Sequence, residues 1–166
     1  MQMRSYVVLL VLLLVQLMAA WHAKAQDNTI THRVNDSVVL TLERIPFNET
    51  AHTVSYEGDF PVAIDGTPIF GTDGDLPKFK LERAELTIGA ARYQLQTDHM
   101  YNPWFGAGIN PNLIYFSKDG SNYHLQVVCS DGAGTYGAEW MMVGDASIRT
   151  ILTRDEHILF EYFGSP

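Results

Sequence analysis

The chain has 166 residues, of which 46% are hydrophobic and 18% charged, with a single cysteine and a formal net charge of −8. Residues 1–25 contain Arg4 and Lys24 but no acidic residue, so the rest of the chain holds 9 basic and 19 acidic side chains. This excess of negative charge repels phosphate backbones and anionic lipid, and disfavours a nucleic-acid or membrane-surface partner. A lone cysteine excludes an intramolecular disulfide, so packing must hold the core.

The first 25 residues have the pattern of a secretory signal peptide. A short positive start precedes an apolar run at residues 6–15, and Ala23-Lys24-Ala25 places small residues where a signal peptidase cleaves. The run is shorter than the ~20 residues that cross a bilayer, and residue 26 is Gln rather than a lipid-accepting Cys. We therefore expect cleavage after Ala25, a soluble periplasmic or extracellular product, and one domain over residues 26–166.

The first half of the mature chain alternates apolar and polar residues with period two, which is typical of β-strands. Residues 37–43 form such a run, and Pro46 is expected to end it. Residues 60–64 and 67–70 flank Asp65-Gly66, a pair that favours a tight hairpin. Residues 79–88 and 92–97 are predicted to form another hairpin around Gly89, although residues 81, 84, 85 and 88 also fit one helical face.

The second half predicts a regular antiparallel meander. Five apolar runs are separated by short turn signals, and short connections join neighbouring antiparallel strands. The runs are residues 113–117, 123–129, 135–143, 147–153 and 157–163. The expected fold class is therefore all-β, an antiparallel sandwich or a partly closed barrel with a C-terminal five-strand meander.

Two groups of residues are candidates for binding. One group consists of three aspartates that are expected to bring their carboxylates together: Asp65, Asp73 and Asp75. If they bind a metal, the predicted ion is calcium; the alternative is that these aspartates only stabilise turns. The segment from His99 to Phe105 crowds Tyr101, Trp104 and Phe105 beside Asn102-Pro103, where a surface loop is normally polar. These rings either plug one end of the fold or anchor a partner.

The remaining candidates for chemistry have weaker patterns. The run Ser130-Asp131-Gly132 with Gly134 is typical of a glycine-rich hairpin rather than of a phosphate loop or a nucleophile elbow. Cys129 shares a strand face with apolar residues, so we expect a buried, inert thiol. The histidines lack ligand spacing, and those at 124 and 157 are expected to face outward; scattered glutamates offer carboxylate pairs without specificity.

Several short motifs, in this order, resemble those of small exported bacterial proteins of unassigned function. They are Gly71-Thr72-Asp73-Gly74, Met100-Tyr101-Asn102-Pro103-Trp104, Ser130-Asp131-Gly132-Ala133-Gly134, Glu139-Trp140 and Ser147-Ile148-Arg149-Thr150. The resemblance implies a bacterial host and transfers no site residue.

We expect a non-catalytic domain that recognises a protein partner, as a periplasmic inhibitor or immunity factor does, through His99, Tyr101, Asn102, Trp104 and Phe105. The alternatives are a glycan-binding module that uses Tyr101 and Trp104, and a secreted hydrolase with carboxylate or Ser/His chemistry. No cofactor beyond calcium is expected, and the acidic balance favours a basic protein partner.

Overall fold

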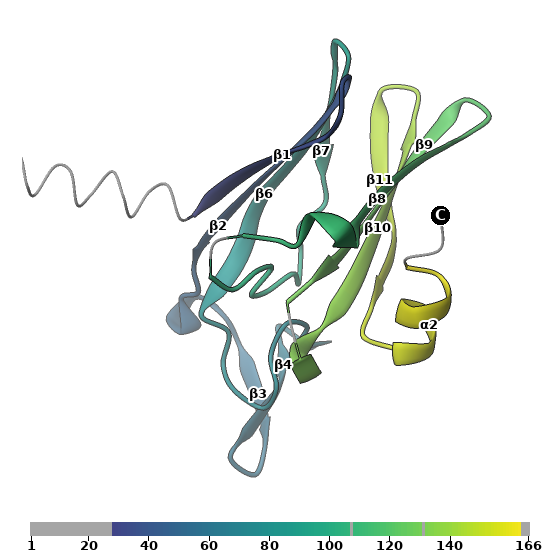
Figure 1. Ribbon diagram of the computed structural model, residues 1–166. Coiled ribbons are helices and arrows are strands. Elements are labelled where there is room, and N and C mark those ends of the chain that lie inside the picture. The colour runs from purple at the N-terminus through teal and green to yellow at the C-terminus, as the bar shows by residue number, and fades with distance from the viewer. Residues whose placement is uncertain (1–27, 107, 131, 164–166) are drawn as a thin grey trace, which may run out of the picture.

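The computed structural model describes residues 28–106, 108–130 and 132–163, and shows an all-β sandwich (Figure 1). The predicted signal peptide lies outside the described residues. The first sheet has the order β1-β2-β6-β7 and consists of β1 (Thr29–Asn35), β2 (Val38–Pro46), β6 (Phe79–Ile88) and β7 (Ala91–Leu95). The second has the order β11-β10-β9-β8 and consists of β8 (Ile114–Asp119), β9 (Asn122–Cys129), β10 (Tyr136–Val143) and β11 (Ala146–Thr153). The prediction of an all-β fold is confirmed, and the observed form is the sandwich rather than the partly closed barrel.

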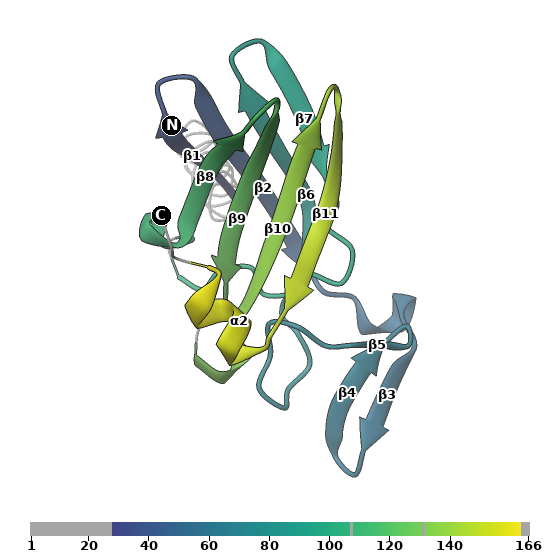
Figure 2. The same cartoon turned by 90° about the vertical axis from the view of Figure 1, so that its right-hand side faces the viewer.

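The core lies between the two facing sheets, which Figure 2 shows as two layers. Alternation along β2 turns Val38, Leu40 and Leu42 inward, each at most 2% exposed. From the other sheet, Leu125 and Trp140 meet them, also almost fully buried. Period-two patterning thus determines the inner faces, as the sequence predicted.

The stretch at 79–88 that also fitted a helical face is a strand with a bulge. Leu81 pairs with Arg44 and Arg83 pairs with Glu43, so Glu82 is an extra residue in β6. The bulge lets Leu81 and Ala84 both face the core although they are three residues apart. This irregularity explains why the segment mimics helical spacing.

The predicted fifth strand of the C-terminal meander is wrong. Residues 156–161 form the short helix α2 (Glu156–Glu161), so the meander has four strands. The Asp155 carboxylate accepts hydrogen bonds from the backbone N–H groups of His157 and Ile158, which is N-cap geometry rather than hairpin-turn geometry. The helix lies on the outer face of the second sheet, where a side chain at Gly137 would clash with Leu159 and Phe163. No helix of the described residues is long and apolar enough to span a bilayer.

A small third sheet projects from one end of the sandwich (Figure 2). It contains β3 (Val54–Glu57), β4 (Phe60–Ile64) and β5 (Thr67–Pro68). The hairpin at Asp65-Gly66 is confirmed, because Ile64 pairs with Thr67 and both turn residues have positive φ angles, 52° and 77°. Short 3-10 turns occur at η1 (Glu49–Ala51), η2 (Pro111–Leu113) and η3 (Gly132–Gly134).

Candidate functional site

The segment predicted to recognise a partner is mostly buried. Tyr101 and Trp104 are each 2% exposed and Asn102 is 4% exposed, whereas Phe105 is 40% exposed and His99 is partly buried. An outward aromatic surface made of Tyr101 and Trp104 is therefore not present in this structure. Of the five predicted contact residues, the structure leaves His99 and Phe105 accessible, and the aromatic bend plugs the end of the sandwich.

The buried Trp104 packs against the side chain of Arg44, which belongs to β2. The Arg44 guanidinium lies 4.5 Å from the Trp104 ring centroid and 4.0 Å from that of Phe79, and it donates a hydrogen bond to the Trp104 carbonyl. A guanidinium between two aromatic faces is favourable when it is desolvated. Arg44 and Trp104 are 60 residues apart in sequence, so no local pattern pointed to Arg44.

Tyr101 belongs to a second, smaller core at the base of the third sheet. It packs with Ile64 and Ile69, and its ring meets Phe47 edge-on at 5.6 Å between centroids. Burial raises the pKa of Tyr101 to about 12, so the phenol stays neutral. This cluster attaches the third sheet to the sandwich.

Asn102 ties three segments together. Its Oδ1 accepts hydrogen bonds from the backbone N–H groups of Lys78 and Phe79, both at 3.0 Å, and its Nδ2 donates to the Gly71 carbonyl at 2.9 Å. The φ angle of Asn102 is +39°, a conformation that Asn tolerates better than most residues. Gly71 must stay glycine, because a Cβ there would lie 2.1 Å from the Tyr101 carbonyl oxygen.

The Ser130 turn contacts both the bend and the Gly71 loop. The backbone N–H of Ser130 donates to the Pro103 carbonyl at 3.2 Å, and its hydroxyl lies 3.4 Å from the Gly71 carbonyl oxygen. Asp131 lies outside the described residues. The loop at 71–77, the bend and the Ser130 turn thus converge at one end of the sandwich.

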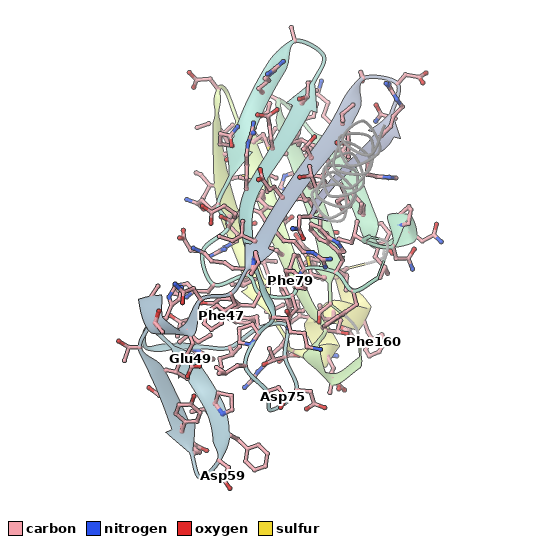
Figure 3. All side chains as sticks on the ribbon, turned by 90° about the vertical axis from the view of Figure 1, so that its left-hand side faces the viewer. Phe47, Glu49, Asp59, Asp75, Phe79 and Phe160 are labelled. Atoms are coloured by element: carbon pink, nitrogen blue, oxygen red, sulfur yellow. The ribbon has the colours of Figure 1, made fainter. Side chains whose placement is uncertain are left out.

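A cavity of about 320 Å³ lies where these loops meet. Its polar lining comes from Asp73, Asp75, Lys78 and Ser130, and Phe105 adds an aromatic wall. Figure 3 labels Asp75 on the loop between the third sheet and the sandwich. The two aspartates and Lys78 are exposed, so the cavity opens to solvent with an excess of negative charge.

The three aspartates predicted for calcium do not all face this cavity. The Asp65 carboxylate accepts the backbone N–H of Thr53 at 2.8 Å and lies 2.7 Å from Nδ1 of His52. The hydrogen bond with His52 lowers the pKa of Asp65, and the Thr53 bond adds to the effect. Among the described residues, no group of three His, Cys, Asp or Glu side chains is placed to hold an ion. Calcium binding stays a prediction.

A buried carboxylate lies on the outer face of the second sheet. Glu139 is 3% exposed and contacts three side chains: His124 Nδ1 at 3.1 Å, the Thr150 hydroxyl at 2.6 Å and the Tyr162 hydroxyl at 3.0 Å. Burial raises the pKa of Glu139, but the hydrogen bonds from Thr150, His124 and Tyr162 outweigh burial and lower it. The cluster fastens α2 to the sheet and covers part of His124, which points outward as predicted.

The thiol of Cys129 is 1% exposed, and burial raises its pKa to about 12. The expectation of a buried thiol is thereby confirmed, and a raised pKa disfavours the reactive thiolate.

Comparison of the chain with protein families, characterised proteins and solved structures gives no match. The function has to be inferred from the chemistry of the described residues.

Proposed function

We propose that the chain is an exported, non-catalytic domain that binds a protein partner by taking a basic side chain of that partner into the cavity at residues 71–78. The observation that supports this is the convergence of three loops on one open cavity, held in place by the side chain of Asn102. Rigid loops lower the entropy lost on binding. Export rests on the predicted signal peptide at residues 1–25.

The charge around the cavity favours a cationic ligand. Residues 45–77 contain six acidic residues and no Lys or Arg, and Asp73 and Asp75 line the cavity directly. Opposite charge on a partner increases the encounter rate and penalises acidic competitors. The partner's contact surface should therefore be basic.

Arginine is the side chain that fits this lining best. A planar guanidinium can donate hydrogen bonds to two carboxylates and also stack on an aromatic ring, whereas a lysine ammonium is a compact, strongly hydrated charge. Asp73, Asp75 and Phe105 supply both kinds of contact. Lys78 also lines the cavity, so its three charged side chains sum to one net negative charge, which one bound cation neutralises.

Synthetic peptides test the proposal without knowledge of the partner. Acetyl-Gly-Arg-Gly-amide is titrated into ¹⁵N-labelled protein, with the citrulline peptide as its uncharged counterpart. We expect a Kd of about 1 mM for the arginine peptide, with changes in the amide chemical shifts of the cavity loops. The citrulline peptide should bind at least tenfold more weakly. Equal binding of the two peptides would refute the proposal.

Matched variants locate the contact. The double variant Asp73→Asn and Asp75→Asn should abolish arginine binding, and Phe105→Ala should weaken it several-fold. As the control, Asp119→Asn together with Asp145→Asn removes two exposed acids at the β8–β9 and β10–β11 turns and should change nothing. If the control variant weakens binding as much as the double variant, only general electrostatics is at work.

The two other sequence-based functions have less support. Glycan stacking was predicted on Tyr101 and Trp104, and both rings are buried. A hydrolase needs a nucleophile beside its base, and the Glu139 cluster uses its oxygens to hold Thr150 and Tyr162.

A further inference from the structure

The β3–β4 hairpin projects from the sandwich as an arm (Figures 1 and 2). Phe60 is 63% exposed and Tyr56 is 48% exposed, and both lie near the turn at Gly58-Asp59. Figure 3 labels Asp59 at the tip of the arm. Phe60 shares one face of the hairpin with its partner Glu57, whereas Tyr56 lies on the opposite face, so Phe60 is the exposed ring that this face offers near the turn.

The arm has a fixed base. Phe47 stacks on His52 at 5.1 Å between ring centroids, and His52 contacts Asp65 at the turn that ends β4. The small core of Ile64, Ile69 and Tyr101 lies directly beneath. Along the arm, the Tyr56 hydroxyl donates to Glu49 at 3.1 Å. The base therefore holds the arm in a defined direction.

The tip of the arm is continuous with the cavity loop. A Cβ at Gly74 would lie 3.3 Å from Cδ1 of Phe60, so the Phe60 ring rests on the 71–77 loop. The exposed acids Glu57 and Asp59 flank the ring. Arm and cavity form one acidic surface around an exposed aromatic group.

We propose that the arm docks on a basic protein, placing the Phe60 ring in an apolar depression of that protein while Glu57 and Asp59 face its cations. The inference rests on the proposed function only in that the chain binds a protein, and it adds a contact outside the cavity. Charge complementarity decides the occupant, because Glu57 and Asp59 are exposed and the stretch 45–77 contains no Lys or Arg. A second copy would bring like charges together, which is unfavourable. An aromatic anchor within a charged rim is the usual composition of an energetically important contact.

Photo-cross-linking tests the arm. A benzoylphenylalanine replaces Phe60, or Phe160 as the matched control, since Phe160 on α2 is also an exposed phenylalanine, 82% accessible. The full mature chain is irradiated in extract from the native host, and adducts are identified by mass spectrometry. We expect an adduct with a protein of basic pI from position 60 and not from position 160. An adduct with a second copy, an adduct with an acidic protein, or no adduct specific to position 60 overturns the inference.

The adduct supports the inference only if substitutions in the arm also weaken the affinity for the cross-linked protein. With the purified partner, Phe60→Ser should weaken binding about tenfold or more, and so should the charge reversals Glu57→Lys and Asp59→Lys together. The same reversal at Asp119 and Asp145, in turns of the second sheet, is the control and should weaken it less than threefold. Equal losses from both pairs would overturn the inference.

The arm and the cavity can fail separately. Phe60→Ser should still bind acetyl-Gly-Arg-Gly-amide, because Phe60 touches the 71–77 loop at Gly74 but does not line the cavity. If the wild-type protein does not bind the arginine peptide but position 60 still gives its cross-link, the cavity proposal is refuted and the arm proposal stands. If the peptide binds and the cross-link is absent, only the arm proposal is refuted.

Discussion

Replacing Asn102 with alanine should destabilise the protein more than any other single polar change in the cavity region. The substitution removes the acceptor of the Lys78 and Phe79 N–H groups and the donor to the Gly71 carbonyl. An unsatisfied buried group costs about 1–3 kcal/mol, with the low end applying to the two partly buried N–H groups. Alanine at a φ of +39° adds about 1 kcal/mol. Because the Ser130 hydroxyl, 3.4 Å away, still reaches the Gly71 carbonyl oxygen, that group also takes the low end, and we expect a total loss of about 4 kcal/mol.

Two further variants separate these contributions. Asn102→Gly tolerates the positive φ angle and should be about 1 kcal/mol more stable than Asn102→Ala. Asn102→Asp keeps an acceptor but turns an oxygen toward the Gly71 carbonyl, so it should be destabilised at pH 7 and partly recover once the carboxyl is protonated and can donate.

Urea denaturation followed by tryptophan fluorescence measures these losses, because Trp104 and Trp140 are both buried. The arginine peptide should also lose its binding site in Asn102→Ala, since the 71–77 loop is no longer tied to the bend. A loss below about 1 kcal/mol for Asn102→Ala would refute the view that this amide holds the loops together.

Three other predictions concern burial, pH and metal. Trp104→Ala should cost about 3–5 kcal/mol by chemical denaturation, whereas Phe160→Ala, at an exposed ring, should stay within about 0.5 kcal/mol; similar values for the two would contradict the plug. The pKa of Glu139 is lowered in the fold, so its carboxylate contributes stability that is present above the unfolded pKa of about 4.5 and is lost as pH falls through the folded pKa. Glu139→Gln should therefore cost about 1–2 kcal/mol at pH 7 and flatten the acid limb of the stability profile. An unchanged acid limb would exclude this role. Chelation should leave the thermal midpoint unchanged, because Asp65 is held by His52 and Thr53; a drop of several degrees would instead demonstrate a bound cation.

The sequence predicted those features that depend on near neighbours. Alternation from Val38 to Leu42 identified the inner face of β2, and Asp65-Gly66 identified a tight turn. β1 was missed because it is an edge strand with only every second residue half-buried, which leaves a weak apolar pattern. α2 was mistaken for a strand because its few apolar residues face Gly137 over little more than one turn, too short to show a helical period.

The aromatic bend illustrates the limit of local patterns. Its composition predicted that something must cover the rings, and left open whether that was a partner or the fold itself. The contact that covers Trp104 comes from Arg44, whose guanidinium lies against the rings of both Phe79 and Trp104, and Arg44 and Phe79 come together only when β2 pairs with β6. Contacts of this kind join residues distant in sequence, so no window along the chain contains them.

The chain by itself thus determined the fold class, the acidic character and most turn positions, since these follow from side-chain alternation, charge count and the backbone preferences of single residues. Only the tertiary structure decided that Asn102 faces inward to brace three loops, that Phe105 lines the cavity, and that Phe60 stands at the tip of an arm. Those outcomes depend on which strands become neighbours, and strand pairing is settled by packing of the whole core.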